Sequence, residues 1–116
     1  MSKKRRDIDF IGDIQEAMEM AALYTKGLTF RKFLEDRKTQ DAVIRNLEVI
    51  GEASKNISSA FKVKYPDVPW KTLAGLRDKL IHFYFGIDYR IVWNVVKKEL
   101  PKLRKQIKHI SKSEAE

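Results

Sequence analysis

The sequence contains no cysteine, which excludes disulfide bridges, thiolate zinc sites and a cysteine nucleophile. It has only two histidines, and no carboxylates cluster around them, so we expect neither a structural nor a catalytic metal. No apolar run approaches the roughly 18 residues that a membrane span requires. The basic N-terminus also lacks the apolar stretch of a signal peptide. We therefore expect a cytoplasmic protein with no membrane contact.

The length and charge indicate one basic domain. The chain has 116 residues, 43% of them hydrophobic, so we expect a single domain over residues 1–116 with its core at about 7–110. Lysine and arginine number 24 against 16 acidic residues, and the excess is concentrated at the two termini. A net charge of +8 favours a polyanionic partner, because phosphate contacts release counterions. A charge bias that only improves solubility is the alternative.

The hydrophobic pattern has a helical period throughout, and no segment shows the two-residue alternation of a strand. Four to five helices joined by short loops predict an all-α, antiparallel bundle. Within the longest helix, the small residues Gly51 and Ala53 would let a neighbouring helix approach closely. The expected helices are one capped by Asp7 that ends before Gly27, a short one capped by Thr29, a long one from about Thr39 to Phe61, one from Trp70 to Tyr84, and a last one capped by Asp88 that kinks or restarts at Pro101.

Packing alone does not explain the helix expected from Trp70 to Tyr84. Arg77 falls inside its apolar arc, where an unpaired charge is costly, so the guanidinium must be paired, line a cleft or face another subunit. Asp78 and His82 are four residues apart on another side, where a carboxylate could orient an imidazole. Arg77 and His82 lie about 140° apart around a helix and would flank a groove. The alternative is an arginine in a salt bridge within the bundle and a histidine at a frayed helix end.

That groove could bind a phosphate. Arg77 would supply charge-assisted hydrogen bonds while His82 exchanges a proton. One imidazole cannot easily be both base and acid in the same turnover. A twofold homodimer would solve this by bringing two copies of both residues to a shared cleft.

The run GLRDKLIHFYFGID resembles the signature of HEPN-domain proteins, an Arg followed after four to six residues by a His. Here these are Arg77 and His82. The ending His82-Phe83-Tyr84 is similar to the HxY ending of the HepT branch, whose members are toxin partners of MntA-type minimal nucleotidyltransferases. Supporting matches are AVIRNLEVIGEASKNI, YPDVPWKTLAGLRD and VWNVVKKELPKL, so the resemblance extends over about residues 7–110.

The resemblance implies a HEPN-type bundle that dimerises and acts as a metal-independent ribonuclease with a composite site. Arg77 would bind and polarise the scissile phosphate, and His82 would be general base or acid for attack by the ribose 2′-OH, leaving a cyclic phosphate. Tyr84 would be the residue to which an MntA-type antitoxin attaches AMP from ATP, as in a type VII-like toxin–antitoxin pair. Phosphate charge added beside Arg77 could then block the cleft. The chain itself would need no cofactor.

Two carboxylates are candidates for supporting roles. Asp78 could orient His82 or be a solvent-exposed acid. Glu52 could pair with Arg77 across a helix interface or be an ordinary surface or core-edge residue.

The remaining aromatic and basic residues have simpler interpretations. Trp70, Tyr89 and Trp93 are expected to pack in the core, with stacking on RNA bases as the alternative. His109 is expected to be solvated. The N-terminal basic cluster and the lysine-rich C-terminal helix are candidates for RNA backbone contact or for docking an acidic partner.

Two other functions remain open: a non-catalytic substrate- or nucleotide-binding subunit of a minimal nucleotidyltransferase, and a purely structural dimerisation bundle. The combination of Arg77, His82 and Tyr84 favours the ribonuclease, because a docking helix would not require all three.

Overall fold

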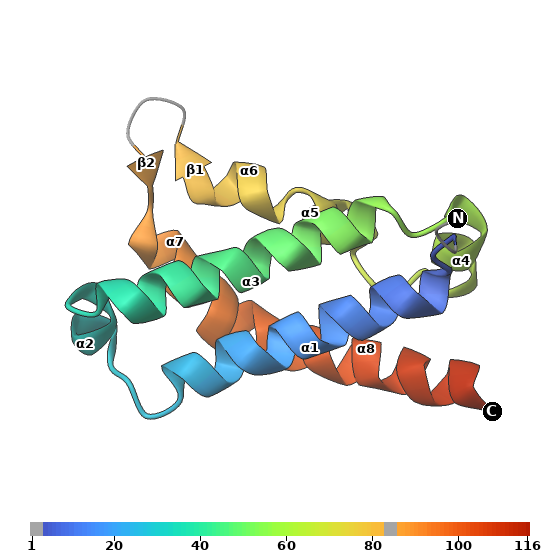
Figure 1. The fold of residues 1–116 in the computed structure, drawn as a ribbon, viewed down its shortest axis with the longest axis horizontal. Helices are drawn as coiled ribbons and strands as arrows, with labels where there is room; N and C mark the ends of the chain where they lie inside the picture. The colour runs from blue at the N-terminus through green and yellow to red at the C-terminus, as the bar shows by residue number, and fades with distance from the viewer. Residues whose placement is uncertain (1–3, 83–85) are drawn as a thin grey trace.

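The computed structural model describes residues 4–82 and 86–116, and for Ile81 and His82 it describes the backbone alone. Helices account for most of this part of the chain (Figure 1). In chain order the elements are α1 (Asp7–Thr25), α2 (Phe30–Leu34), α3 (Arg37–Lys55), α4 (Ser59–Lys64), α5 (Trp70–Ala74), α6 (Leu76–Leu80), β1 (Ile81–His82), β2 (Gly86–Ile87), α7 (Tyr89–Asn94), the π-helical segment η1 (Val95–Glu99) and α8 (Leu100–Ala115).

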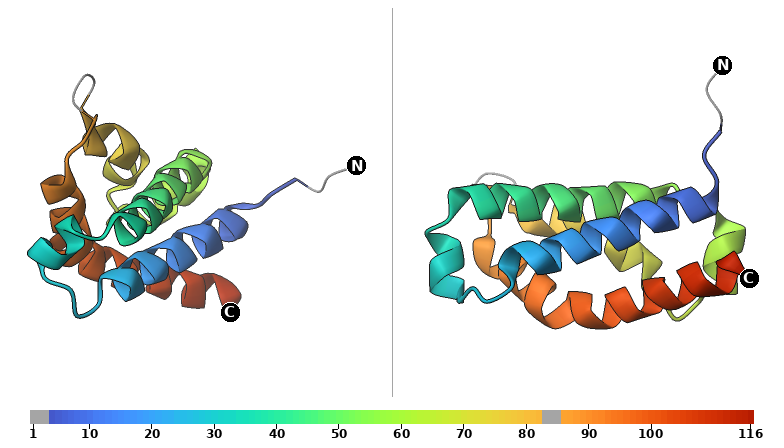
Figure 2. Two further views of the ribbon diagram at one scale, coloured as in Figure 1. Left: turned by 60° about the vertical axis from the view of Figure 1, so that its left-hand side comes forward. Right: turned by 60° about the horizontal axis from the view of Figure 1, so that its bottom comes forward.

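The long helices form an antiparallel bundle, as predicted. Helix α1 packs against α3 and α8, and the α5–α6 segment packs on the other side of α3 (Figures 1 and 2). In Figure 1 and in the left view of Figure 2, α6 and α8 lie at opposite edges of the bundle. The core between the helices consists mainly of aliphatic side chains, with the aromatic rings of Phe33, Phe61 and Trp70. The all-α fold class is therefore confirmed.

Helix α1 buries the predicted stripe but begins differently. Its first residue is Asp7, and the carboxylate of Asp9 accepts the Arg6 N–H at 2.8 Å. Asp7 is therefore not the cap, and its carboxylate instead accepts the N–H of Ser58 at 2.8 Å and its hydroxyl at 2.6 Å. The buried stripe contains Ile11, Ile14, Met18 and Ala21.

The single long helix expected from Thr39 to Phe61 is wrong. The helix ends at Lys55 and restarts at Ser59, because the Ser58 hydroxyl accepts the Phe61 N–H at 3.2 Å and caps a new helix. The same serine is held by Asp7, 51 residues away. The apolar spacing nevertheless continues across the break, since Val43, Leu47, Ile50, Ser54, Ile57 and Phe61 are all buried.

The other predicted caps are confirmed. Thr29 accepts the Lys32 N–H at 3.1 Å, and Asp88 accepts the N–H groups of Arg90 and Ile91.

The restart at Pro101 is also confirmed. Pro101 lies in the first turn of α8 and follows the π-helical segment Val95–Glu99. Proline has no N–H to donate to the carbonyl four residues earlier, so the regular helical ladder is interrupted there.

The prediction that the chain has no strand is wrong at one place. Ile81 pairs with Ile87 and His82 with Gly86 in an antiparallel hairpin. Each strand has two residues, which is too short for an alternating pattern to appear in the sequence. Over the described ranges, no helix is long and apolar enough to cross a membrane.

Candidate functional site: the α6–β1 segment

The segment that carries the Arg-x4-His signature is not one helix. Arg77 and Asp78 lie on α6, whereas His82 belongs to β1. The helix predicted from Trp70 to Tyr84 is therefore wrong at two points: it is interrupted at Gly75 and ends at Leu80. The angular separations expected from a continuous helix do not apply to Asp78, Arg77 and His82.

The two breaks have physical causes. Gly75 is a poor helix former and closes α5, where its N–H donates to the Lys71 carbonyl at 3.0 Å. Past Leu80 the chain enters the hairpin, and the Asp88 N–H donates to the Leu80 carbonyl at 3.1 Å. Gly86 has a φ of +77°, a conformation that glycine adopts without strain.

Arg77 is exposed, and within residues 4–82 and 86–116 it has no ion-pair or hydrogen-bond partner. The expectation that it lies within the apolar arc is wrong, because Ile81 leaves the helix and no longer extends that arc past Arg77. The buried side of the segment is formed by Leu73, Leu76 and Leu80. A salt bridge within the bundle, the structural alternative, is not found in the described residues. The guanidinium is therefore available to a ligand.

The backbone beneath Arg77 is closely packed on α3. A β-carbon added to Gly51 would lie 3.4 Å from the Leu73 carbonyl oxygen, 3.5 Å from that of Ala74 and 3.8 Å from the Arg77 amide nitrogen. The predicted close approach of a neighbouring helix at this small residue is confirmed. Gly51 thus sets how closely the α5–α6 turn approaches α3.

A surface ion pair also connects α6 to the π-helical segment η1. Lys79 Nζ lies 3.3 Å from Glu99 Oε2 in η1, and both side chains are about two-fifths exposed. Sequence reasoning missed this pair, because nothing in the sequence signals a contact between residues 20 apart. Exposed pairs of this kind contribute on the order of 0.2–1 kcal/mol.

The two candidate supporting carboxylates are both exposed. Neither Asp78 nor Glu52 forms an ion pair in the part of the chain that the structure describes, so no pairing of Glu52 with Arg77 is observed. The predicted interaction of Asp78 with the His82 side chain, and the role of Tyr84, lie outside the described side chains. The backbone places His82 opposite Gly86.

The aromatic residues pack as predicted. Trp70 is buried, its indole N–H donates to the Tyr65 carbonyl at 2.9 Å, and its ring meets Phe61 edge-on. Tyr89 and Trp93 both contact the ring of Phe33. These contacts support a structural role for all three.

His109 is exposed, as expected for a solvated residue. No group of three or more potential metal ligands occurs among the described residues.

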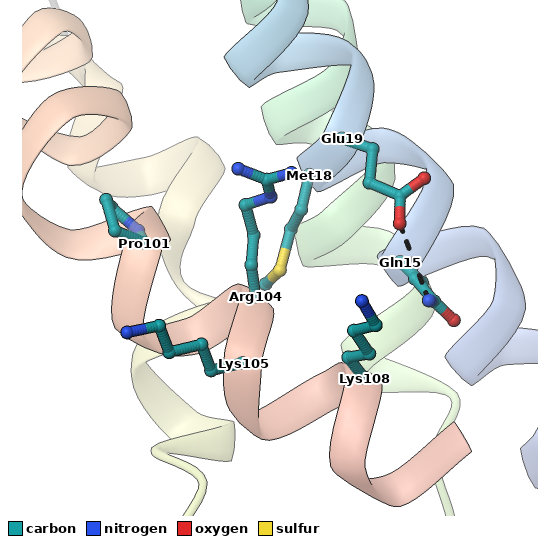
Figure 3. A pocket seen from close by; sticks show the side chains of 7 residues that line it. All are labelled: Gln15, Met18, Glu19, Pro101, Arg104, Lys105 and Lys108. Carbon is teal, nitrogen blue, oxygen red and sulfur yellow. Dashed lines mark hydrogen bonds between the residues drawn. The ribbon is translucent and has the colours of Figure 1, made fainter. Parts of the chain in front are cut away.

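Basic residues lie on both sides of the bundle. Near the motif, Lys55, Lys62 and Lys71 line an open hollow beside the start of α5. Across the molecule, side chains of α1 and α8 line a groove of about 300 Å³ (Figure 3). Its basic residues all belong to α8. The sequence predicted a lysine-rich helix here but not a groove, although the four-residue spacing of Arg104 and Lys108 indicates that both lie on one face of the helix.

The combination of a helical bundle, an exposed Arg77 on a tightly packed turn and a His82 five residues later defines a protein of the HEPN class. The family model described as "Ribonuclease HepT-like" matches residues 14–110. The chain belongs to this family. The predicted HEPN and HepT resemblance is thus confirmed.

Curated relatives agree with this assignment. The chain is 49% identical over 109 residues to a protein of Thermococcus cleftensis named probable ribonuclease HepT, covering 94% of this chain and 99% of the relative. It is 54% identical over 103 residues to a provisionally named RNase of Methanocaldococcus jannaschii (89% and 85% covered). A provisionally named RNase of Caldanaerobacter subterraneus is 45% identical over 105 residues (90% and 94% covered). No solved structure gives a significant match.

Proposed function

We propose that the protein is a metal-independent ribonuclease whose active site is shared by the two protomers of a twofold dimer. The observation that carries the proposal is that the Arg77 side chain is exposed and has no partner in the described residues. The backbone that carries it is packed against Gly51 of α3. Membership of the ribonuclease HepT-like family, and relatives named as ribonucleases, support RNA as the substrate.

In the proposed reaction, Arg77 binds the non-bridging oxygens of the scissile phosphate and stabilises the charge that develops on them. One His82 removes the proton from the ribose 2′-OH, whose oxygen attacks phosphorus. The 5′ oxygen leaves with a proton supplied by a second His82, giving a 2′,3′-cyclic phosphate and a free 5′-OH. Two imidazoles are needed because base and acid act in the same step, which motivates the dimer.

We further propose that an MntA-type nucleotidyltransferase antitoxin silences the enzyme by transferring AMP from ATP to the hydroxyl of Tyr84. The support is the position of Tyr84, two residues beyond His82 in the HxY ending. The added phosphate would compete with RNA for the guanidinium of Arg77. The protein would then be the toxin of a type VII-like pair.

The test is cleavage of total RNA in EDTA by the parent and by four variants. Arg77→Ala and His82→Ala should lose activity by about 100-fold or more, as expected for loss of a charge-stabilising or proton-transferring group. Arg31→Ala, at an exposed position of α2, and His109→Ala, which removes the chain's other histidine, are matched controls and should keep parental activity.

Equal activity in all five proteins would contradict the assignment. No cleavage by any of them, with an intact mass that shows unmodified Tyr84, would favour the non-catalytic binding subunit.

A further inference from the structure

Helix α8 gathers exposed basic residues that form no ion pair with another residue of the described chain. In the first half of the chain, arginines pair with nearby carboxylates, as in Arg5–Asp13 and Arg37–Asp41. On α8 the one acidic residue, Glu114, is already bound to Lys64. The unpaired basic residues of α8, all exposed and without an ion-pair partner within the described ranges, are Lys102, Arg104, Lys105, Lys108 and Lys112.

Three of these residues, Arg104, Lys105 and Lys108, line a groove rather than a convex surface. Arg104 extends into the space between α8 and α1 beside Met18, and Lys108 points towards Gln15 (Figure 3). The carboxylate of Glu19 on the facing helix accepts the amide N–H of Gln15 at 3.5 Å instead of pairing with either cation. Their charges are therefore directed into the groove without being neutralised.

The groove continues along the bundle. A second open hollow, lined in part by Lys26 and Lys97, shares Glu19 and Arg104 with the first. Lys97 is itself held by the Thr25 carbonyl, to which its Nζ donates at 2.8 Å. The unpaired cations from Lys102 to Lys112 span about 15 Å of helix at 1.5 Å per residue. An elongated basic groove of this kind suits an extended polyanion better than a single anion.

We propose that the α1–α8 groove and the exposed face of α8 form a second RNA-binding surface, which holds the substrate backbone away from Arg77. The identity of the ligand rests on the proposed ribonuclease function. The surface fits phosphates better than a protein partner, because protein interfaces centre on apolar side chains. In the described residues, the large exposed hydrophobic side chains are Leu23, Tyr24, Leu34 and Val63; none lies on α8, and Leu23 alone among them lines the second hollow.

The position of the groove sets a length requirement. In Figure 1 and in the left view of Figure 2, α8 runs along the opposite edge of the bundle from α6. Glu99, the residue before α8 begins, reaches α6 through its ion pair with Lys79. An RNA bound at both Arg77 and the groove must pass around part of the bundle, whose shortest extents are 31 Å, so it must be longer than a dinucleotide. The groove should therefore strengthen binding of longer RNAs and have no effect on a dinucleotide.

The test compares two double variants with equal charge change. Arg104→Glu with Lys108→Glu alters the groove, and Lys32→Glu with Lys38→Glu alters exposed residues on α2 and α3. Each pair lowers the net charge of +8 by four. Binding is measured by fluorescence anisotropy with a 2′-O-methyl RNA of about 16 nucleotides, which covers a typical single-strand site and has no 2′-OH to attack. Cleavage of a dinucleotide is measured in parallel.

We expect the groove pair to bind the RNA roughly tenfold more weakly, with the slope of log affinity against log salt reduced by roughly 1.4, the value for two lost phosphate contacts. The control pair should stay within about twofold of the parent, and both pairs should cleave the dinucleotide at the parental rate. If the groove pair does not fold, Arg104→Gln with Lys108→Gln gives the same comparison with a smaller charge change.

If both double variants bind RNA equally weakly, the loss of affinity reflects overall charge alone and the proposal is overturned. Parental affinity in the groove pair would overturn it as well. Polyglutamate of matched charge that competes as well as RNA would also overturn it and point to an acidic protein instead. If the parent cleaves no RNA but only the groove pair loses binding, the surface stands and the ribonuclease function fails.

Discussion

Gly51 lies directly beneath the backbone of Arg77, so that a β-carbon added there would lie 3.8 Å from the Arg77 amide nitrogen and 3.4 Å from the Leu73 carbonyl oxygen. These are ordinary van der Waals distances, so Gly51→Ala should leave stability and RNA cleavage close to the parent. Gly51→Val adds two methyl groups more than Gly51→Ala at a closely packed interface and should cost about 1–3 kcal/mol. We expect it to lower cleavage as well, because the turn that carries Arg77 must move.

The control for this pair is Gly12→Val. Gly12 is also helical, but nothing lies within 4 Å of a β-carbon added there. Urea unfolding and cleavage rates should separate the two valine variants. If Gly51→Val behaves like Gly12→Val in both measurements, the α3 contact does not position Arg77.

Trp70 is predicted to stabilise the fold and not to bind RNA. Trp70→Phe removes the indole bond to the Tyr65 carbonyl and should cost about 1 kcal/mol of unfolding free energy. Trp70→Ala should cost about 3–5 kcal/mol, since the ring is buried against Phe61. Tyr24→Ala, at a surface position, is the control. A Trp70→Phe variant of parental stability with weakened RNA binding would instead support base stacking.

The C-terminal end of α8 should weaken at acid pH. The carboxylate of Glu114 accepts hydrogen bonds from Lys64 and then from the Tyr65 hydroxyl, which lower its pKa. A carboxyl whose pKa is lowered in the folded state stabilises it above the unfolded pKa, and this contribution is lost as pH falls through the folded value. Stability should therefore decline below about pH 4.

This pH effect is measured by urea unfolding between neutral and acid pH. Glu114→Gln should flatten the decline of unfolding free energy at acid pH. Glu116→Gln, two residues further along the chain, should not. Superimposable acid limbs for the parent and Glu114→Gln would contradict the prediction.

The helical periodicity of the sequence was sufficient to predict the bundle and most of its core. For example, Ile11, Val43 and Leu100 were assigned to the apolar faces of their helices from spacing alone, and all three are fully buried. The helix ends were less predictable, because they depend on contacts distant in sequence. Ser58 restarts a helix while bound to Asp7, and the apolar spacing through Ile57 gives no sign of it.

The candidate site shows the same division. Arg77 and His82 were identified from their spacing, but the change from helix to hairpin between them was not. Leu80 ends its helix where Asp88 supplies an N–H to its carbonyl, a contact that forms only once the chain has folded back. The groove beside Arg104 likewise depends on α1 lying opposite, which no local pattern specifies.

A shared active site predicts that one defective protomer inactivates the dimer. Heterodimers of the parent and His82→Ala, isolated with two different affinity tags, would contain a single imidazole and could not supply both base and acid. Their activity should fall to that of the His82→Ala homodimer. Heterodimers with His109→Ala are the control. Half the parental activity in the His82→Ala heterodimer would indicate two independent sites.

Tyr84 is predicted to be required for silencing but not for catalysis. Tyr84→Phe lacks the hydroxyl that would accept AMP, so it should cleave RNA at close to the parental rate and gain no mass on incubation with ATP and the nucleotidyltransferase. Tyr24→Phe, which changes an exposed tyrosine on α1, should gain the mass of AMP and lose activity as the parent does. AMP on the Tyr84→Phe variant would place the modification elsewhere.

Metal-free attack by the ribose 2′-OH leaves chemically distinctive ends on the two RNA products. The most direct test is mass spectrometry of the products from a defined oligoribonucleotide in EDTA, using protein whose intact mass shows an unmodified chain. We expect fragments that end in a 2′,3′-cyclic phosphate with matching 5′-hydroxyl ends, and none from Arg77→Ala. An intact oligonucleotide, or fragments with 5′-phosphate ends, would contradict this mechanism.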